Sequence, residues 1–473
     1  MSFDPDVRKQ QELVEYQKFV EIKNDTNFPP LTVVNQRILD NGTVDSQTTT
    51  YPKYAVLTYN VNGAQTNGSP FGDNSSVDAF GRLRVSQPKT LLDSKMFYDK
   101  QTQTFDEALS GTATSVFSAY DSCIVMNTFA KNDYVIRQTR QRFDYQPGKS
   151  LSYIFTGLFS PETNVIKRVG AFQSLTAQPF DPVDGVWLEV NQEGPILRCE
   201  KSQGTTYSMI APQSAWNIDK MDGSGTSGLT IDFAKAQIFT IDYEWLSLGR
   251  VRYGFYLNGK CFYVHQDTHL NALNAPYMSY GNQPVRYEIR QVGDGSGVMK
   301  QICCTVISEG GEDEVGTLVS AGLSSVIAVG NTANRYYPII GARLSPDRPN
   351  ISAYIKNLLV QNMDASVGME ARIYFNPTLT SPLQWRKLDS QGIEFAFGDG
   401  TTYVTGGQQV FVGYVLAGAK GGAESIQLPP SVASLGMSLS GVPDQIIIAG
   451  RSLKSGGAGT NDTLGSITAL LKG

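Results

Sequence analysis

The chain has 473 residues, of which 18% are charged, and its formal net charge is −5. A chain of this length exceeds what one hydrophobic core ordinarily serves, so the sequence predicts two or three domains. The low charged fraction, the mild acidity and the lack of any basic run longer than Lys167-Arg168 argue against nucleic acid as a partner.

The five cysteines indicate a protein of a reducing compartment. Their number is odd, their spacing is irregular and no CxxC pair occurs, so we expect buried thiols rather than disulfides or a cofactor site. Adjacent Cys303 and Cys304 would point to opposite faces of a strand, which disfavours a disulfide between them.

The first residues lack the apolar stretch of a secretion signal, and no apolar run reaches the roughly 18 residues of a membrane span. We therefore expect a protein made and folded in the cytoplasm, without membrane insertion.

The start of the chain, residues 1–30, is predicted to hold an amphipathic helix that serves as a docking segment. Asp4 is a suitable N-cap for this helix. Leu13, Tyr16 and Val20 then recur at helical spacing and form an apolar stripe. A single helix ahead of a β-rich chain must cover this stripe, either on a partner or neighbouring subunit or on its own chain. We expect the first arrangement and take these three residues as candidate partner contacts.

Strands are predicted for most of the remaining chain. Residues 31–86 are polar and turn-rich and are expected to form an extended arm. Through residues 87–355, runs of β-branched and aromatic residues alternate with Gly, Pro and Asn turns. The clearest predicted strands of this central region are 133–143, 150–159, 186–190, 238–243, 251–257, 260–264, 285–291 and 301–308. Many short strands at near-regular intervals predict an antiparallel β-sandwich of jelly-roll or lectin-like type.

A smaller C-terminal β domain with a Gly-rich tail is predicted over residues 356–473. Its candidate strands are 367–375, 392–397, 408–416, 445–448 and 465–471. The predicted fold class is therefore mainly β, with an N-terminal helix and two β domains.

One turn is specified by its two residues. Asn258-Gly259 separates two β-rich runs, and this pair favours the type I′ turn, in which both residues have positive φ. The sequence therefore predicts that 251–257 and 260–264 pair as a hairpin.

A distinctive motif lies near the start of the central region. Residues 77–86 read Val-Asp-Ala-Phe-Gly-Arg-Leu-Arg-Val-Ser, with Leu92-Asp93 behind them. The pattern continues, in order, at residues 185–187, 216–220, 222–223, 227–228, 235–239, 244–245, 249–254, 263–265 and 284–290. Over residues 77–310 the chain resembles virion structural proteins of tailed bacteriophages and some large DNA viruses. The resemblance implies a tail-fibre, neck, spike or capsid-surface component without catalytic residues.

Charged residues within the predicted strands suggest ion pairs. Arg250 and Arg252 share one strand face, and Asp242 and Glu244 share a face of the preceding strand. We expect these groups to pair across neighbouring strands, and Arg82 and Arg84 of the motif, which also share a face, to serve packing and pairing as well. Ligand binding by these arginines is the alternative.

The two histidines, His265 and His269, are weak metal candidates. HxxxH on a helix places two imidazoles on one face and can begin a zinc site. Position 266 is Gln, where a zinc hydrolase would carry Glu. The pair also follows a predicted strand, on which residues i and i+4 lie about 13 Å apart. Hydrogen bonding at a strand end is the alternative, and we predict no metal and no cofactor.

No catalytic motif is found: GxSxG is absent, and no Walker A or GxGxxG fingerprint follows a predicted strand. Two groups of acids are candidates for chemistry. A glycosidase pair could come from Asp181, Asp184, Glu189 and Glu193, and a Ca²⁺ site from Glu309, Glu312, Asp313 and Glu314. Solvated acids are commoner than either, so the sequence predicts that the protein is not an enzyme.

Two functions remain. The main prediction is a non-catalytic structural component of the virion that assembles with other virion proteins and forms a homo-oligomer such as a trimer. The alternative is a lectin-like receptor-binding protein that recognises host-surface glycans. Aromatic rings stack on sugars, and Tyr277 and Tyr280 are the candidate glycan contacts. The sequence does not place the protein in the head, neck, tail or fibre.

Overall fold

The computed structural model describes residues 20–23, 31–38, 44–51, 78–79, 84 and 87–472, without 389–391, 418–421, 429–432 and 457–458. The chain divides into two compact units, Met1–Val77 and Asp78–Gly473, and each is considered by itself. In the described residues no helix is long and apolar enough to cross a membrane.

The first unit contains a three-stranded antiparallel sheet. Its strands, in sheet order, are β1 (Val20–Lys23), β2 (Leu31–Ile38) and β3 (Val44–Tyr51). The helix predicted within residues 1–30 is wrong for Val20–Lys23, which form β1. The sequence Val-Glu-Ile-Lys alternates β-branched with charged residues, a pattern that suits a paired strand. The rest of that helix, including Leu13 and Tyr16, lies outside the described residues, as do the side chains of this sheet.

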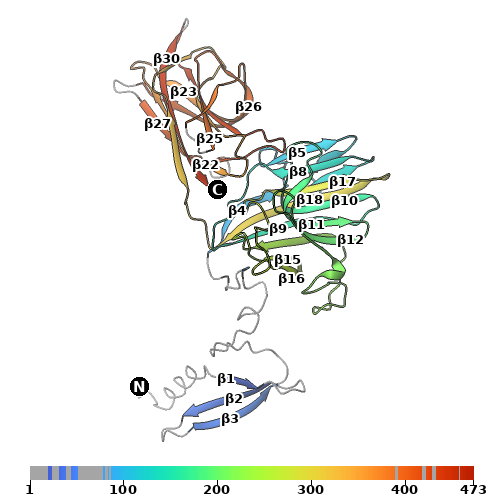
Figure 1. Cartoon of the computed structure of the whole chain (residues 1–473). Coiled ribbons are helices and arrows are strands. Elements are labelled where there is room, and N and C mark those ends of the chain that lie inside the picture. The colour runs from blue at the N-terminus through green and yellow to red at the C-terminus, as the bar shows by residue number, and fades with distance from the viewer. Residues whose placement is uncertain are drawn as a thin grey trace. The chain divides into compact units, whose positions relative to one another are not determined.

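The second unit contains two β-sandwiches, drawn in Figure 1 in blue to yellow for the first and in orange to red for the second. One sheet of the first sandwich has seven strands, in the order β13 (Tyr207–Pro212), β12 (Gly194–Lys201), β11 (Pro182–Asn191), β10 (Val165–Ser174), β17 (Val285–Gln291), β8 (Tyr134–Thr139) and β5 (Phe105–Ser110). The other has the order β16 (Lys260–Asp267), β15 (Val251–Leu257), β14 (Ala236–Tyr243), β9 (Ser150–Leu158), β18 (Gly297–Glu309), β7 (Cys123–Thr128) and β6 (Thr114–Ser118), with β4 (Lys89–Lys95) also paired to β18. A 3-10 turn, η1 (Gln213–Ala215), follows β13.

The second sandwich also has two sheets. The first has the order β19 (Thr317–Gly322), β30 (Thr460–Lys472), β22 (Ser352–Asn362) and β27 (Gly422–Ile426), with β20 (Ile327–Gly330) on β30 and β28 (Ser434–Leu435) on β22. The second has the order β24 (Trp385–Lys387), β25 (Ile393–Phe397), β21 (Tyr337–Leu344), β29 (Gln445–Ser452), β23 (Met369–Leu379) and β26 (Val404–Val415). Every pairing between these strands of the two sandwiches is antiparallel.

The sandwiches are mostly built from the strands that the sequence predicts, and the mainly β fold class is confirmed. The hairpin turn is also confirmed, because Asn258 and Gly259 have φ of 51° and 75° between β15 and β16. The change from the first to the second sandwich occurs between Glu309 and Thr317, not at residue 355, because β19 to β22 belong to the sheets of the C-terminal strands.

Each sandwich has its own core. In the first, rings from the two sheets meet, as where Phe155 of β9 lies 6.1 Å from Tyr287 of β17 in an edge-to-face arrangement. In the second, aliphatic residues dominate: Ile340, Ile373 and Ile448 come from one sheet and Leu358 and Ile467 from the other. All five cysteines are free thiols, and Cys123, Cys199 and Cys304 are buried as expected.

A loop of the second sandwich rests on the first. Residues 436–444, between β28 and β29, form this docking loop. The backbone N–H of Met437 donates to the carbonyl of Arg140 at 3.0 Å, and that of Leu439 donates to Asp106 at 2.7 Å. The Leu439 side chain packs with Tyr134, Ile136 and Phe180 of the first sandwich. Backbone hydrogen bonds and an apolar cluster therefore join the two sandwiches.

Close strand approach at Gly170 provides a test of the first sandwich. A Cβ at this position of β10 would lie 2.4 Å from the Val186 carbonyl oxygen and 2.6 Å from the Trp187 Cα. Because both contacts are with backbone atoms, we expect Gly170→Ala to lower the free energy of unfolding by about 1–3 kcal/mol or more. Thermal unfolding followed by circular dichroism measures the effect. Gly322→Ala is the control, since its nearest neighbour is Ser466 Cβ at 3.4 Å; equal melting temperatures for the two variants would contradict this packing.

Candidate functional site

The motif arginine Arg84 lies in a buried cluster of charges around Asp242. The Asp242 carboxylate is fully buried, and Arg84 and Arg252 each approach its Oδ2 to 2.5 Å. Arg84 also contacts Glu309 at 2.5 Å, and the Tyr263 hydroxyl donates to Asp242 at 2.9 Å. The predicted pairing of Arg252 with Asp242 is confirmed, because the two residues are directly opposite on β14 and β15.

The cluster keeps its charges in the folded state. Burial alone would raise the pKa of Asp242, but the guanidinium groups of Arg252 and Arg84 outweigh it and hold that pKa below its usual range. Ser150 donates a further hydrogen bond to the same carboxylate. Arg84 and Arg252 therefore neutralise a buried anion and form part of the framework of the sandwich.

The other residues of the resemblance are also framework residues. Arg250 donates to the Ala79 carbonyl from Nε at 3.0 Å and from Nη2 at 2.8 Å, which ties the motif to β15. Asp219 accepts hydrogen bonds from the backbone N–H groups of Met221 and Ser227 at 2.8 and 2.6 Å and so organises its loop. Trp216 packs in the core against Phe255, with ring centroids 5.9 Å apart.

A second charge cluster surrounds Glu288 on β17. Its carboxylate is fully buried and pairs with Arg168 at 2.8 Å, with Arg286 at 2.5 Å and with Arg290. Burial would raise the pKa of Glu288, but these three cations outweigh it and lower the pKa to about 2. Glu189 of β11 extends the cluster through Arg168 and Arg198, at 2.7 and 2.9 Å.

The carboxylates considered for catalysis are not brought together. Glu189 is held by two arginines, and Asp184 accepts hydrogen bonds from the Ser279 backbone and the Gln283 amide, each at 2.8 Å. Asp181 is exposed and contacts Arg290 at 3.5 Å, and Glu193 lies in the turn between β11 and β12. These four acids therefore provide no pair of facing carboxyl groups.

The acids considered for Ca²⁺ also have separate partners. Glu309 pairs with Arg84, Glu312 with Lys472 at 2.7 Å, Asp313 with Lys149 at 2.9 Å and Glu314 with Lys356 at 2.5 Å. Four carboxylates on four different cations do not converge on one ion.

The two histidines have different surroundings. His265 accepts a hydrogen bond on Nδ1 from the Asn217 backbone N–H at 3.2 Å, and burial lowers the pKa of His265. His269 is fully buried, with Nδ1 2.5 Å from the Gly249 carbonyl oxygen and Nε2 2.9 Å from Asp267 Oδ2. Among the described residues, one group has metal-ligand spacing, and it contains His269 but not His265.

The candidate glycan contacts also separate. Tyr277 is fully buried, and its ring stacks on His269 with centroids 3.9 Å apart and planes 6° apart. The expectation of an exposed ring is therefore wrong for Tyr277, because this stacking covers it. Tyr280 keeps 41% of its surface exposed.

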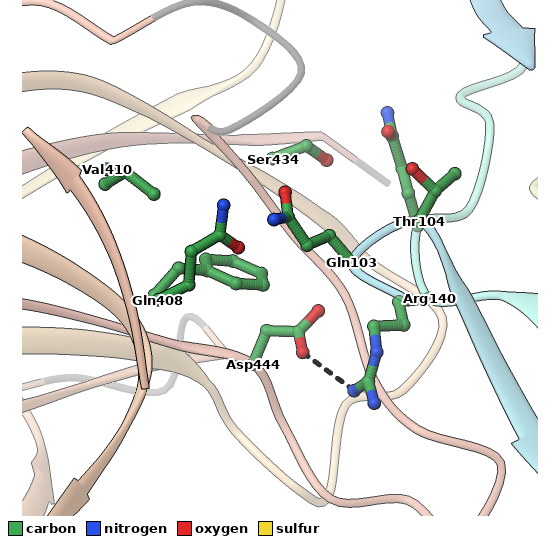
Figure 2. Close-up of a pocket in the computed structure, with 9 residues that line it drawn as sticks. Gln103, Thr104, Arg140, Gln408, Val410, Ser434 and Asp444 are labelled. Carbon is green, nitrogen blue, oxygen red and sulfur yellow. Dashed lines mark hydrogen bonds and ion pairs between the residues drawn. The ribbon is translucent and has the colours of Figure 1, made fainter. Parts of the chain in front are cut away.

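A cavity of about 110 Å³ lies where the two sandwiches meet. Figure 2 shows its walls, with side chains from both sandwiches facing a common space. The lining residues are Gln103, Thr104, Arg140 and Gln141 of the first sandwich and Phe375, Gln408, Val410, Ser434 and Asp444 of the second. No sequence pattern points to this cavity, because its walls come from distant segments that only docking brings together.

The chemistry of the cavity is that of a polar binding site. Arg140 is fixed by Asp444 at 3.0 Å, drawn as a dashed line in Figure 2, and by Asp106 at 2.8 Å. The buried hydroxyl of Ser434 has no hydrogen-bond partner among the described residues. Amides, hydroxyls, a guanidinium and a carboxylate beside the Phe375 ring can serve a small ligand with many hydroxyl groups. The volume is below the roughly 300–1,000 Å³ of common ligand pockets.

Comparisons with known proteins find structural similarity alone. No family model and no curated protein sequence matches the chain. The carbohydrate recognition domain of Emp47p has a TM-score of 0.29 and 14% identity, and the match covers 45% of this chain and 93% of that domain. The β-glucanase of Bacillus licheniformis has a TM-score of 0.30 and 8% identity, and the match covers 45% of this chain and 97% of that enzyme. A legume lectin-like domain from Entamoeba histolytica has a TM-score of 0.29 and 10% identity, and the match covers 46% of this chain and 95% of that domain. These scores and identities are low, so the β-sandwich assignment rests on the strand pairing itself.

Glu244, close to the Asp242 cluster, gives a pH-dependent test. Burial raises the pKa of Glu244 from 4.5 to about 7, and the charges of Asp78 and Asp242 add to the effect. A carboxyl with a higher pKa in the folded than in the unfolded protein contributes stability at low pH that is lost as the pH rises through the folded value. The free energy of unfolding should therefore fall between about pH 4.5 and 7. With solvent screening considered, this fall amounts to about 1–2 kcal/mol.

In Glu244→Gln this part of the pH dependence should disappear, as measured by urea unfolding at a series of pH values. Glu314→Gln is the matched control, because the hydrogen bond from Lys356 lowers the pKa of Glu314 and moves its effect below this pH window. An unchanged slope in Glu244→Gln would contradict the half-buried position of this carboxyl.

Proposed function

We propose that the chain is a non-catalytic structural component of a virus particle that assembles with other virion proteins. The support for the virion is the sequence resemblance over residues 77–310. The observation that carries a structural role is the position of Arg84: the motif residue is bound to Asp242 and Glu309 inside the sandwich. A motif residue that joins two carboxylates inside the sandwich supports the role of a rigid structural component.

The test of this proposal is the protein content of purified particles. We expect the chain to be present in stoichiometric amounts in virions of the virus that encodes it, as measured by quantitative mass spectrometry and by antibody labelling in electron micrographs. The position of the label distinguishes head, neck, tail and fibre. Abundant chain in infected cells combined with its absence from purified virions would contradict the proposal.

The oligomeric state is a separate prediction. We expect the purified chain to form a homo-oligomer, and a trimer if it serves as a fibre or spike component. The absolute mass in solution, from size-exclusion chromatography with light scattering, decides between a trimer and the 51.6 kDa monomer. A stable monomer at micromolar concentration would contradict the prediction of a homo-oligomer.

Glycan binding is the second candidate function, and the cavity between the sandwiches favours it. Its lining offers hydrogen-bonding groups from both sandwiches. One of the lining residues, Ser434, has a buried hydroxyl with no hydrogen-bond partner among the described residues. A lectin-like receptor-binding role would place one sugar residue against Phe375, with Gln103 and Gln408 hydrogen-bonded to its hydroxyl groups.

A glycan array followed by titration tests this second function. We expect Gln103→Ala and Gln408→Ala each to weaken binding by about 5–10-fold, the loss that follows from one hydrogen bond. Gln203→Ala, on an exposed loop away from the cavity, is the control. Saturable binding that depends on Tyr280 but not on either glutamine would move the site to the surface around Tyr280. Absence of binding to every glycan would leave the structural role alone.

A further inference from the structure

Three buried side chains from distant parts of the first sandwich meet near His269. Cys199 lies on β12 of the seven-stranded sheet, Asp267 is the last residue of β16 at the edge of the other sheet, and His269 follows two residues later. One potential ligand atom from each residue, Sγ, a carboxylate oxygen and a ring nitrogen, lies within 4.8 Å of the other two. The described strands β12 and β16 belong to different sheets and do not pair, so the cluster is a point of contact between the sheets.

The hydrogen bonds of His269 leave one of its nitrogens directed at the cluster. Nδ1 lies 2.5 Å from the Gly249 carbonyl oxygen, so it carries a proton and donates it to this oxygen. Nε2 lies 2.9 Å from Asp267 Oδ2, so it faces the other members of the cluster and can bind a metal ion when it carries no proton. A hydrogen bond from one ring nitrogen to a backbone carbonyl is also how proteins orient a histidine that binds a metal through the other.

The surroundings fit a divalent cation. A thiolate from Cys199 and the carboxylate of Asp267 would together neutralise a doubly charged ion, so that the site carries no net charge in the protein interior. The Tyr207 hydroxyl, 2.8 Å from Asp267 Oδ2, binds the carboxylate and can orient it. The Tyr277 ring covers the imidazole on one side, and the Tyr207 ring meets it edge-on with centroids 5.1 Å apart. These contacts hold the ring in place.

We propose that Cys199, Asp267 and His269 form a structural zinc site that links the two sheets of the first sandwich. Thiolate and imidazole ligands together select zinc among the common divalent ions, and a carboxylate is its usual oxygen ligand. A water molecule would complete the four ligands, because the Tyr207 hydroxyl is already bound to the Asp267 carboxylate. The ion supplies a cross-link between β12 and the end of β16 in a protein whose cysteines form no disulfide.

Metal titration of the purified full chain tests the site. The chain is freed of metal with a chelator and titrated with Co²⁺, which reports a thiolate ligand through its near-ultraviolet charge-transfer band, and then with Zn²⁺. We expect one equivalent of Co²⁺ to bind and to be displaced by Zn²⁺, and we expect bound zinc to raise the melting temperature. A folded chain that takes up neither ion at micromolar concentration overturns the proposal.

Matched variants assign the ligands. We expect Cys199→Ala and His269→Gln to weaken binding by more than the roughly 10–100-fold that loss of an outer partner costs. Cys304→Ala and His265→Gln change a buried cysteine and a buried histidine outside the cluster and should bind as the wild type does. Equal losses in both pairs of variants overturn the assignment.

X-ray absorption at the zinc edge of the wild-type protein gives an answer that does not depend on whether the variants fold. We expect one sulfur scatterer at about 2.3 Å together with nitrogen and oxygen at about 2.0–2.2 Å. A spectrum without sulfur places the bound zinc elsewhere and overturns the proposal.

Discussion

Burial of paired charge is the constraint on which the first sandwich depends. Arg137, Arg252 and Arg286 are all fully buried, a position that costs several kcal/mol unless a carboxylate and further contacts compensate. Each has the same two kinds of partner: a carboxylate and the face of an aromatic ring. The pairs of partners are Glu107 and Phe105 for Arg137, Asp242 and Tyr263 for Arg252, and Glu288 and Phe172 for Arg286. The same combination of a carboxylate and an aromatic ring therefore compensates the burial of a guanidinium group in three places.

These charges also fix how the strands align. Arg168 of β10 stands directly opposite Glu189 of β11 and Glu288 of β17, so one guanidinium group joins three strands. A shift of one residue in either pairing would turn the carboxylates toward the opposite face of the sheet. Because that face is the apolar core, such a slip would bury charge without a partner. The ion pairs therefore act together with the hydrophobic pattern to specify the register of this sheet.

Sequence reasoning succeeds where the information is local and fails where it depends on docking. The residue pair Asn258-Gly259 is enough to predict the turn between β15 and β16, and the position of charged residues on successive strands is enough to predict the pairing of Arg252 with Asp242. The boundary between the sandwiches escapes prediction because strands and turns continue through residues 317–362 with no change in composition. The spacing of Val20 from Leu13 and Tyr16 predicts a helix, although pairing with a neighbouring strand decides the conformation of 20–23.

The candidate sites illustrate the same limit. The HxxxH spacing draws attention to His265 and His269 together, but His269 belongs with Cys199, which lies 70 positions earlier on another sheet. A loop sequence around Tyr277 predicts a place at the surface, and only the three-dimensional contact with His269 buries it. The cavity between the sandwiches has no counterpart in the sequence at all, since Arg140 and Asp444 meet only through the docking loop.

The wide separation of the Arg84 contacts along the chain has a consequence for biosynthesis. Asp242 and Glu309 follow Arg84 by 158 and 225 positions. At a translation rate of about 5–20 residues per second, Arg84 is synthesised roughly 10–45 seconds before its last partner. During this interval β4 also lacks β18, the strand with which it pairs. The nascent segment therefore spends many seconds as an unpaired strand with an uncompensated arginine. A molecular chaperone that binds exposed strands would protect the chain most during this interval.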